Sequence, residues 1–142
     1  MGAARDLVAR AGRFDEANVK FEDIKKALLS SDLLHASHGE LERFIGGEGR
    51  ELLRLLLQGH LDARGEARAL GPVVGADGVE RTHVRQDTSR ELATTVGSVR
   101  VPRARYEARG LDGLHPADAE LELPPGLYSQ EIQRLLALQA AQ

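Results

Sequence analysis

Arginine side chains between positions 81 and 109 are the groups in this sequence best suited to bind a ligand. Seven arginines occur there against three acidic residues, although the whole chain has a formal net charge of −3. A guanidinium presents its N–H donors in a geometry that matches phosphate oxygens, so a basic face on an acidic chain favours phosphate contact at one place. The residues of this candidate nucleic-acid face are Arg81, Arg85, Arg100, Arg103, Arg105 and Arg109. The alternative is that these arginines only keep an exposed sheet face hydrated.

The residues that must position these arginines alternate as in β-strands. Leu92, Thr94 and Val96 alternate with polar or small residues, and the alternation resumes after Gly97-Ser98, which predicts a two-residue hairpin loop. Unbroken alternation would turn two arginines toward the core. Because Pro102 cannot donate a ladder hydrogen bond, we predict a bulge or edge position beside it that reverses the inward face. The residues then predicted to face inward are Val99, Val101, Ala104, Tyr106 and Ala108.

Together with a strand over 79–86, these strands favour a three-stranded antiparallel meander with the arginines on its outer face. Gly-Ala-Asp-Gly before that strand is typical of a turn, in which Asp77 is a turn residue rather than a cation ligand.

The first half of the chain has helical periodicity. Apolar residues from Ala17 to Leu28 share one helical face, with Asp15 or Asn18 as candidate caps. A capping box at Ser37 and Glu40 predicts a second helix from His38 to about Arg64. Glycines 46, 47 and 49 oppose that helix, so it is either one kinked helix, which we favour, or two helices with a hinge.

The predicted organisation is α+β. A flexible N-terminus over 1–16 precedes a helical region over 17–70 and the β-meander over 71–110. An irregular, acid-leaning linker over 111–128 leads to a C-terminal helix over 129–142, which is capped by Ser129 and looks truncated.

Leucines on the second helix form a stripe broader than one helical partner would cover, which favours a homo-oligomer. The candidate self-association residues are Leu52, Leu53, Leu56 and Leu57. A clean apolar heptad is absent.

Residue types needed for catalysis are missing or scattered. The chain has no cysteine, which removes thiol nucleophiles and cysteine zinc sites. The histidines are not spaced as metal ligands, and neither a phosphate-binding glycine loop nor a nucleophile with an orienting base occurs. No apolar segment suits a membrane span or an export signal. We therefore expect a cytoplasmic protein that is not an enzyme and has no cofactor, small-molecule substrate or membrane partner.

Four segments together resemble the N-terminal region of ISKra-four family insertion-sequence transposases, which are bacterial DDE-type enzymes. They are HGELERFIGGEGRELLRLLLQGHLDARG, PVVGADGVERTHVR, TTVGSVRVPRARYEARG and LHPADAELELPPGLYSQEI, and the similarity covers about residues 18 to 140 in order. Glycines 46 and 47 depart from the helix-favouring residues of that family.

In such proteins this region precedes a ribonuclease-H-like domain whose acidic residues bind a divalent metal. That domain is absent from this chain, so no catalytic residue is carried over. The resemblance implies a role in DNA-end recognition or assembly, with DNA as partner. About five phosphate contacts would predict a slope of about −4 to −5 in log affinity against log salt. The alternatives are a protein-interaction module that dimerises through the 52–61 leucines, and a decayed gene fragment.

Overall fold

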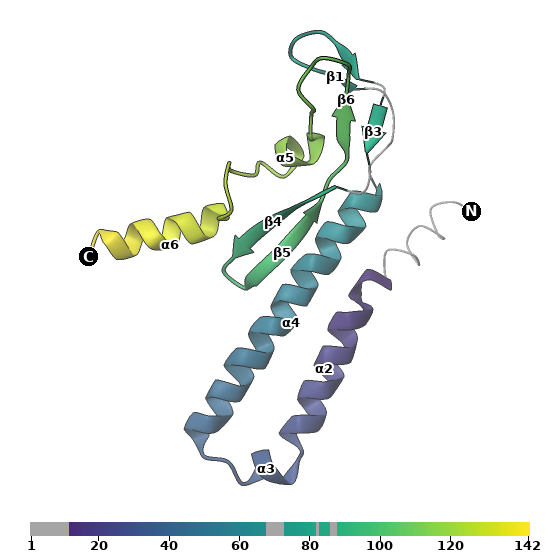
Figure 1. Cartoon of the computed structure of the whole chain (residues 1–142). Coiled ribbons are helices and arrows are strands. Elements are labelled where there is room, and N and C mark those ends of the chain that lie inside the picture. Colours follow the sequence, from purple (N-terminus) through teal and green to yellow (C-terminus); the bar gives the residue numbers. More distant parts are fainter. Residues whose placement is uncertain (1–11, 68–72, 82, 86–87) are drawn as a thin grey trace. The chain divides into compact units, whose positions relative to one another are not determined.

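The chain combines a long helix, pairs of antiparallel strands and a C-terminal helix, which confirms the α+β class (Figure 1). The computed structural model describes residues 12–67, 73–81, 83–85 and 88–142. It divides into two compact units, Met1–Ala63 and Arg64–Gln142. A flexible N-terminus was predicted for residues 1–16. Residues 1–11 lie outside the described residues, and residues 12–16 are helical.

The first unit is a helical hairpin. A 3₁₀ turn, η1 (Gly12–Phe14), leads into α2 (Asp15–Leu28), a short α3 (Ser31–Leu34) and the start of α4 (His38–Ala67). Phe14 stands at the N-cap of α2 without a side-chain hydrogen bond, so the prediction of a cap by Asp15 or Asn18 was wrong. Ser30 caps α3, because its Oγ accepts from the Leu33 amide at 3.4 Å.

The capping box predicted for α4 is confirmed. The Glu40 amide donates to Ser37 Oγ at 3.2 Å, and the Ser37 amide donates to Glu40 Oε2 at 3.0 Å. The helix then runs through the glycine cluster without interruption to Ala67, for 30 residues. The alternative of two helices joined by a hinge is therefore wrong.

The close approach of η1 to α4 depends on one glycine. A Cβ at Gly59 would lie 2.6 Å from the Arg13 carbonyl oxygen and 2.9 Å from Phe14 Cδ1, so only glycine lets η1 approach there. Ala17 and Leu61 are buried, and Lys20 of α2 forms an ion pair with Glu48 of α4. The apolar contact between the two helices is thus concentrated at one end of the hairpin.

The second unit is built on paired strands. β1 (Val73–Val74) pairs with β2 (Glu80–Arg81), β3 (His83–Arg85) with β6 (Arg105–Glu107), and β4 (Ser89–Thr94) with β5 (Gly97–Pro102), all antiparallel. The predicted three-stranded meander is wrong: the described residues form three two-stranded sheets. The β4–β5 pair and the β3–β6 pair follow one another along a single hairpin. β3, which precedes β4 in the chain, therefore pairs with β6 and does not add a third strand beside β4.

The predicted reversal of the inward face beside Pro102 is confirmed. Val99 and Val101 are buried, and so are Ala104 and Tyr106, three and five residues after Val101. The register shifts at the same place, because Arg85 pairs with Arg105 whereas Ser89 pairs with Pro102. Between β5 and β6, Arg103 and Ala104 lie outside the strands, so the inward side changes between Val101 and Ala104. This interruption lets the valines and Tyr106 share one core.

The hairpin loop lies two residues earlier than predicted. Thr94 pairs with Gly97, so the loop residues are Thr95 and Val96, and Gly97 begins β5 with φ 123°. Thr94 explains this position: its hydroxyl donates to the Gly97 carbonyl at 2.7 Å and accepts from the Val96 amide at 3.2 Å. Gly97 thus has a positive φ, which glycine adopts readily, at a strand end rather than inside the loop.

The segment over 111–128 is part of the second unit rather than a linker. Leu114 exchanges both backbone hydrogen bonds with Tyr106 at 2.8 Å, and Ala93 forms a parallel bridge to Tyr128. Between these contacts lies α5 (Pro116–Glu120), whose Ala117 is 1% exposed. Pro116 is the first residue of this helix. Proline is favourable at the first helical position, where its missing N–H would have no partner.

The C-terminal helix α6 (Gln130–Ala140) starts as predicted. Ser129 Oγ accepts from the Ile132 amide at 3.3 Å. None of the residues of α6 is buried.

Candidate nucleic-acid interface

Arg81 does not belong to an exposed basic face. It is 3% exposed, and its guanidinium donates to both carboxylate oxygens of Asp77 at 3.0 and 2.9 Å. It also donates to the Val79 and Asp112 carbonyls, each at 3.2 Å. The prediction that Arg81 faces water was wrong, because the β1–β2 turn and the 111–128 segment use its donors.

Asp77 has the turn role predicted for it. Its Oδ1 accepts from the Val79 amide at 3.0 Å as well as from Arg81. The hydrogen bond from Arg81, assisted by the Val79 amide, lowers the pKa of Asp77 from 3.8 to about 2. Gly78 completes the turn with φ 76°. The Asp77–Arg81 pair therefore stabilises the turn between β1 and β2.

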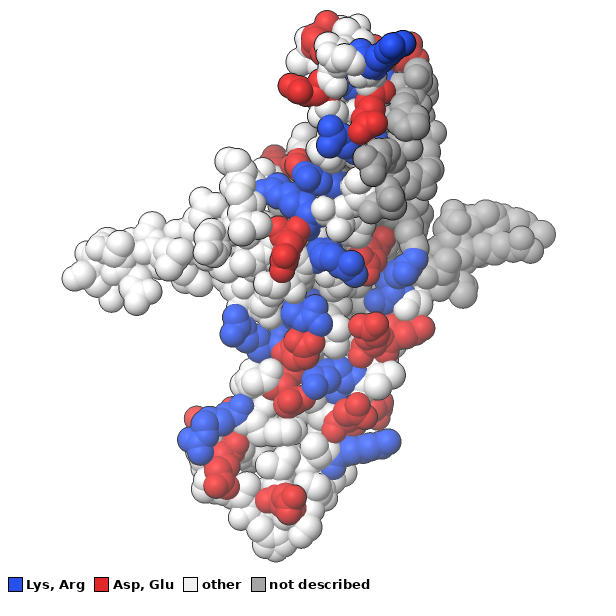
Figure 2. All heavy atoms as spheres, viewed as in Figure 1, with Lys and Arg blue, Asp and Glu red and all other residues white. Residues whose placement is uncertain are grey.

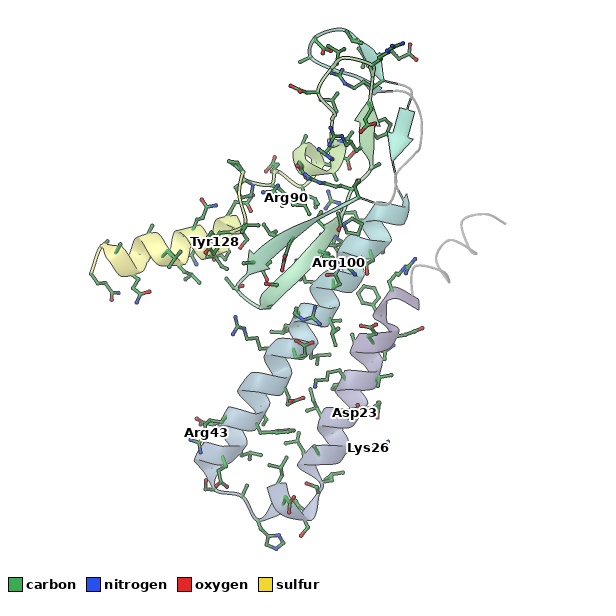
Figure 3. The ribbon with its side chains drawn as sticks, in the orientation of Figure 1. Asp23, Lys26, Arg43, Arg90, Arg100 and Tyr128 are labelled. Atoms are coloured by element: carbon green, nitrogen blue, oxygen red, sulfur yellow. The ribbon has the colours of Figure 1, made fainter. Side chains whose placement is uncertain are left out.

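Arg103 and Arg90 converge on Asp118 of α5. Arg103 Nη1 lies 2.6 Å and Arg90 Nη1 3.7 Å from Asp118 Oδ2. Arg90, which is labelled in Figure 3, also donates to the carbonyls of Pro124 and Gly126. The nearby His115 has its pKa lowered by burial and by the positive charge of Arg103. These arginines hold the 111–128 segment on the hairpin.

The remaining candidate arginines have different surroundings. Arg105 Nε lies 2.9 Å from Glu107 Oε1, and both residues are only partly exposed. Arg100 of β5 and Arg109 are exposed, but Arg100 stands directly opposite Glu91 in the ladder. Arg85 pairs with Arg105 through its backbone, and its side chain lies outside the description.

The described arginines therefore do not form one uninterrupted basic face. Figure 2 shows basic and acidic side chains interleaved over the visible surface. Sequence reasoning placed the acid-leaning segment over 111–128 and the basic stretch before it, but missed that the two are partners. The pairing of Arg90 and Arg103 with Asp118 was not predicted, although the opposite charge of adjoining segments was a signal for it.

The candidate self-association residues lie on α4 as expected. Leu53 and Leu56 are 52% and 41% exposed, whereas Leu52 and Leu57 are partly exposed. Exposed apolar residues also occur on α2, at Val19 and Phe21.

The described residues include no cluster of three or more side chains that suits a metal ion. Within the same residues, no helix has the length and apolar character needed to cross a membrane. Comparison of the chain with protein-family models, curated proteins and solved structures found no match.

Proposed function

We propose that this chain is a non-catalytic assembly region of an insertion-sequence transposase. The observation that carries the assembly role is the exposure of large apolar side chains on each of the three longest described helices. They are Val19 and Phe21 on α2, Ile45, Leu53 and Leu56 on α4, and Leu135, Leu136 and Leu138 on α6. Exposed apolar surface on several elements is typical of a region whose partner surfaces lie elsewhere. The link to a transposase rests on the four segments that resemble that family.

α6 illustrates the assembly surface. Leu135, Leu136 and Leu138 are about half exposed, at 46%, 55% and 52%. The only charged residues of the helix, Glu131 and Arg134, form an ion pair with each other at 2.5 Å. When another surface covers this uncharged, leucine-rich end of the helix, apolar area is removed from water and the free energy falls.

Assembly is better supported than direct DNA contact by the arginine face. Of the six candidate arginines, only Arg100 and Arg109 are described as exposed. Two phosphate contacts predict a salt slope of about −2, whereas five to six predict about −5. Fluorescence anisotropy of a short duplex at several salt concentrations measures this slope. A slope near −5 would favour the DNA-contact alternative over ours.

A transposon excision assay tests the proposed function. The chain is expressed beside a full-length transposase of the resembled family and a reporter element with its ends. We expect it to join the transposase assemblies and lower excision several-fold. Leu135→Glu with Leu136→Glu, which charges the α6 face, is expected to abolish the inhibition, and the Gln133→Glu control on the same helix is expected to keep it. Undiminished excision in the presence of the wild-type chain would refute the proposal.

A further inference from the structure

One face of α4 has coiled-coil spacing but is not covered by α2. We call it the α4 seam: Glu42, Gly46, Gly49, Leu53, Leu56 and His60, which alternate at intervals of four and three residues. Leu53 and Leu56 are 52% and 41% exposed, and Glu42, Gly46 and His60 are exposed too. α2 and η1 instead pack on a different face of the helix, at Glu48 and Gly59. Within the described residues of the first unit, the seam is an unpartnered helix face with two bulky apolar residues.

Among the described residues, no close packing requires the seam glycines. A Cβ at Gly46 or Gly49 would meet nothing within 4 Å, in contrast to Gly59. Each glycine inside a helix costs about 0.5–1 kcal/mol relative to alanine. Packing in the hairpin therefore does not explain these two residues.

The seam becomes complementary to itself when it is reversed. If a second α4 is laid antiparallel about position 51, Glu42 faces His60 of the second copy. In the same register Gly46 faces Leu56, and Gly49 faces Leu53, of that copy. The two inner layers then each combine a glycine with a leucine. The outermost layer combines a glutamate with a histidine. Layers of this kind are how knobs pack into holes in an antiparallel helix pair.

We propose that α4 binds antiparallel to α4 of a second copy of this chain through the α4 seam. A parallel pair would place Glu42 beside Glu42 and leave glycine opposite glycine, so charge and shape both select the antiparallel arrangement. Glu42 Oε1 lies 2.7 Å from His38 Nε2, but both side chains are highly exposed. Such a surface pair contributes little and exchanges readily for one with His60. The inference rests on the proposed assembly role and names its partner.

Cysteine crosslinking tests the register directly, because the chain has no cysteine of its own. Gly46→Cys mixed with Leu56→Cys is expected to form a disulfide under mild oxidation. Leu56→Cys alone is not, because the two copies of position 56 would be about 15 Å apart along the helix axes, too far for a disulfide. Leu34→Cys, at an exposed site on α3, measures random collision. We expect the mixed pair to link at least about tenfold faster than this control.

Two glycine substitutions separate pairing from helix stability. Gly49→Leu is expected to weaken self-association at least about tenfold in sedimentation equilibrium, because its side chain meets Leu53 of the second copy. Gly47→Leu, off the seam on the same helix, is expected to leave association unchanged. Both variants replace a helical glycine by a good helix former, so circular dichroism should show undiminished helicity in both.

Two outcomes would overturn the inference. Fast linking of Leu56→Cys alone would indicate a parallel pair, and collision-rate linking of every variant would indicate a different occupant, such as the chain's own second unit. The excision assay uses wild-type α4 and α6 variants. Inhibited excision without crosslinking would therefore reject the α4 pair and leave the assembly role standing.

Discussion

Two glycines of α4 should respond in opposite directions to the same substitution. Gly47→Ala adds a methyl group where nothing lies within 4 Å, whereas Gly59→Ala adds one 2.6 Å from the Arg13 carbonyl oxygen. Both replacements favour the helical backbone by about 0.5–1 kcal/mol. Only the second forces neighbouring atoms to move.

The magnitude at Gly59 follows from which atoms must move. The nearest contact is a backbone oxygen, and the next are ring carbons of Phe14 at 2.9 and 3.1 Å, so η1 itself must shift. Overpacking of this kind costs about 1–3 kcal/mol. After subtraction of the helix gain, Gly59→Ala should lower the free energy of unfolding by about 0–2.5 kcal/mol, with a central value of about 1 kcal/mol. Gly47→Ala should raise it by about 0.5–1 kcal/mol.

Urea unfolding followed by far-ultraviolet circular dichroism measures both changes. Samples are compared at concentrations at which each variant is monomeric, because association stabilises the folded state by mass action. An unchanged dependence on urea shows that the same surface is exposed in each variant. If Gly59→Ala proved at least as stable as the wild type, the close approach of η1 to α4 would be wrong.

Two further predictions concern the second unit. Asp77 has its pKa lowered from 3.8 to about 2 by Arg81, so its contribution to stability is complete above about pH 4 and is lost as the pH falls toward 2. A carboxyl carbon-13 titration should give that low pKa in the wild type and a value near 3.8 in Arg81→Leu; a wild-type value near 3.8 would contradict the Asp77–Arg81 pair. Val101→Ala, at 1% exposure, should destabilise the unit by about 2 kcal/mol in thermal or urea unfolding. Its matched control Val74→Ala, at 63% exposure, should change stability by less than about 0.5 kcal/mol, and equal effects of the two would place the core elsewhere.

Local patterns in the sequence were sufficient for the starts of α4 and α6 and for the inward residues of the hairpin. The capping box at Ser37, the cap at Ser129 and the reversed face beside Pro102 all depend on residues within a few positions of one another. Such interactions leave a signature in the sequence because their geometry is set by the local backbone.

Tertiary structure decided which strands pair and what the arginines contact. Pairing of β3 with β6 joins residues about twenty positions apart, and Arg103 contacts Asp118 on the short helix α5, in a segment predicted to be irregular. A guanidinium binds a carboxylate as readily as a phosphate. The sequence alone therefore determined that the 81–109 stretch is basic. Only the fold determined that the guanidinium groups of Arg81, Arg90 and Arg103 bind carboxylate and carbonyl oxygens of this chain.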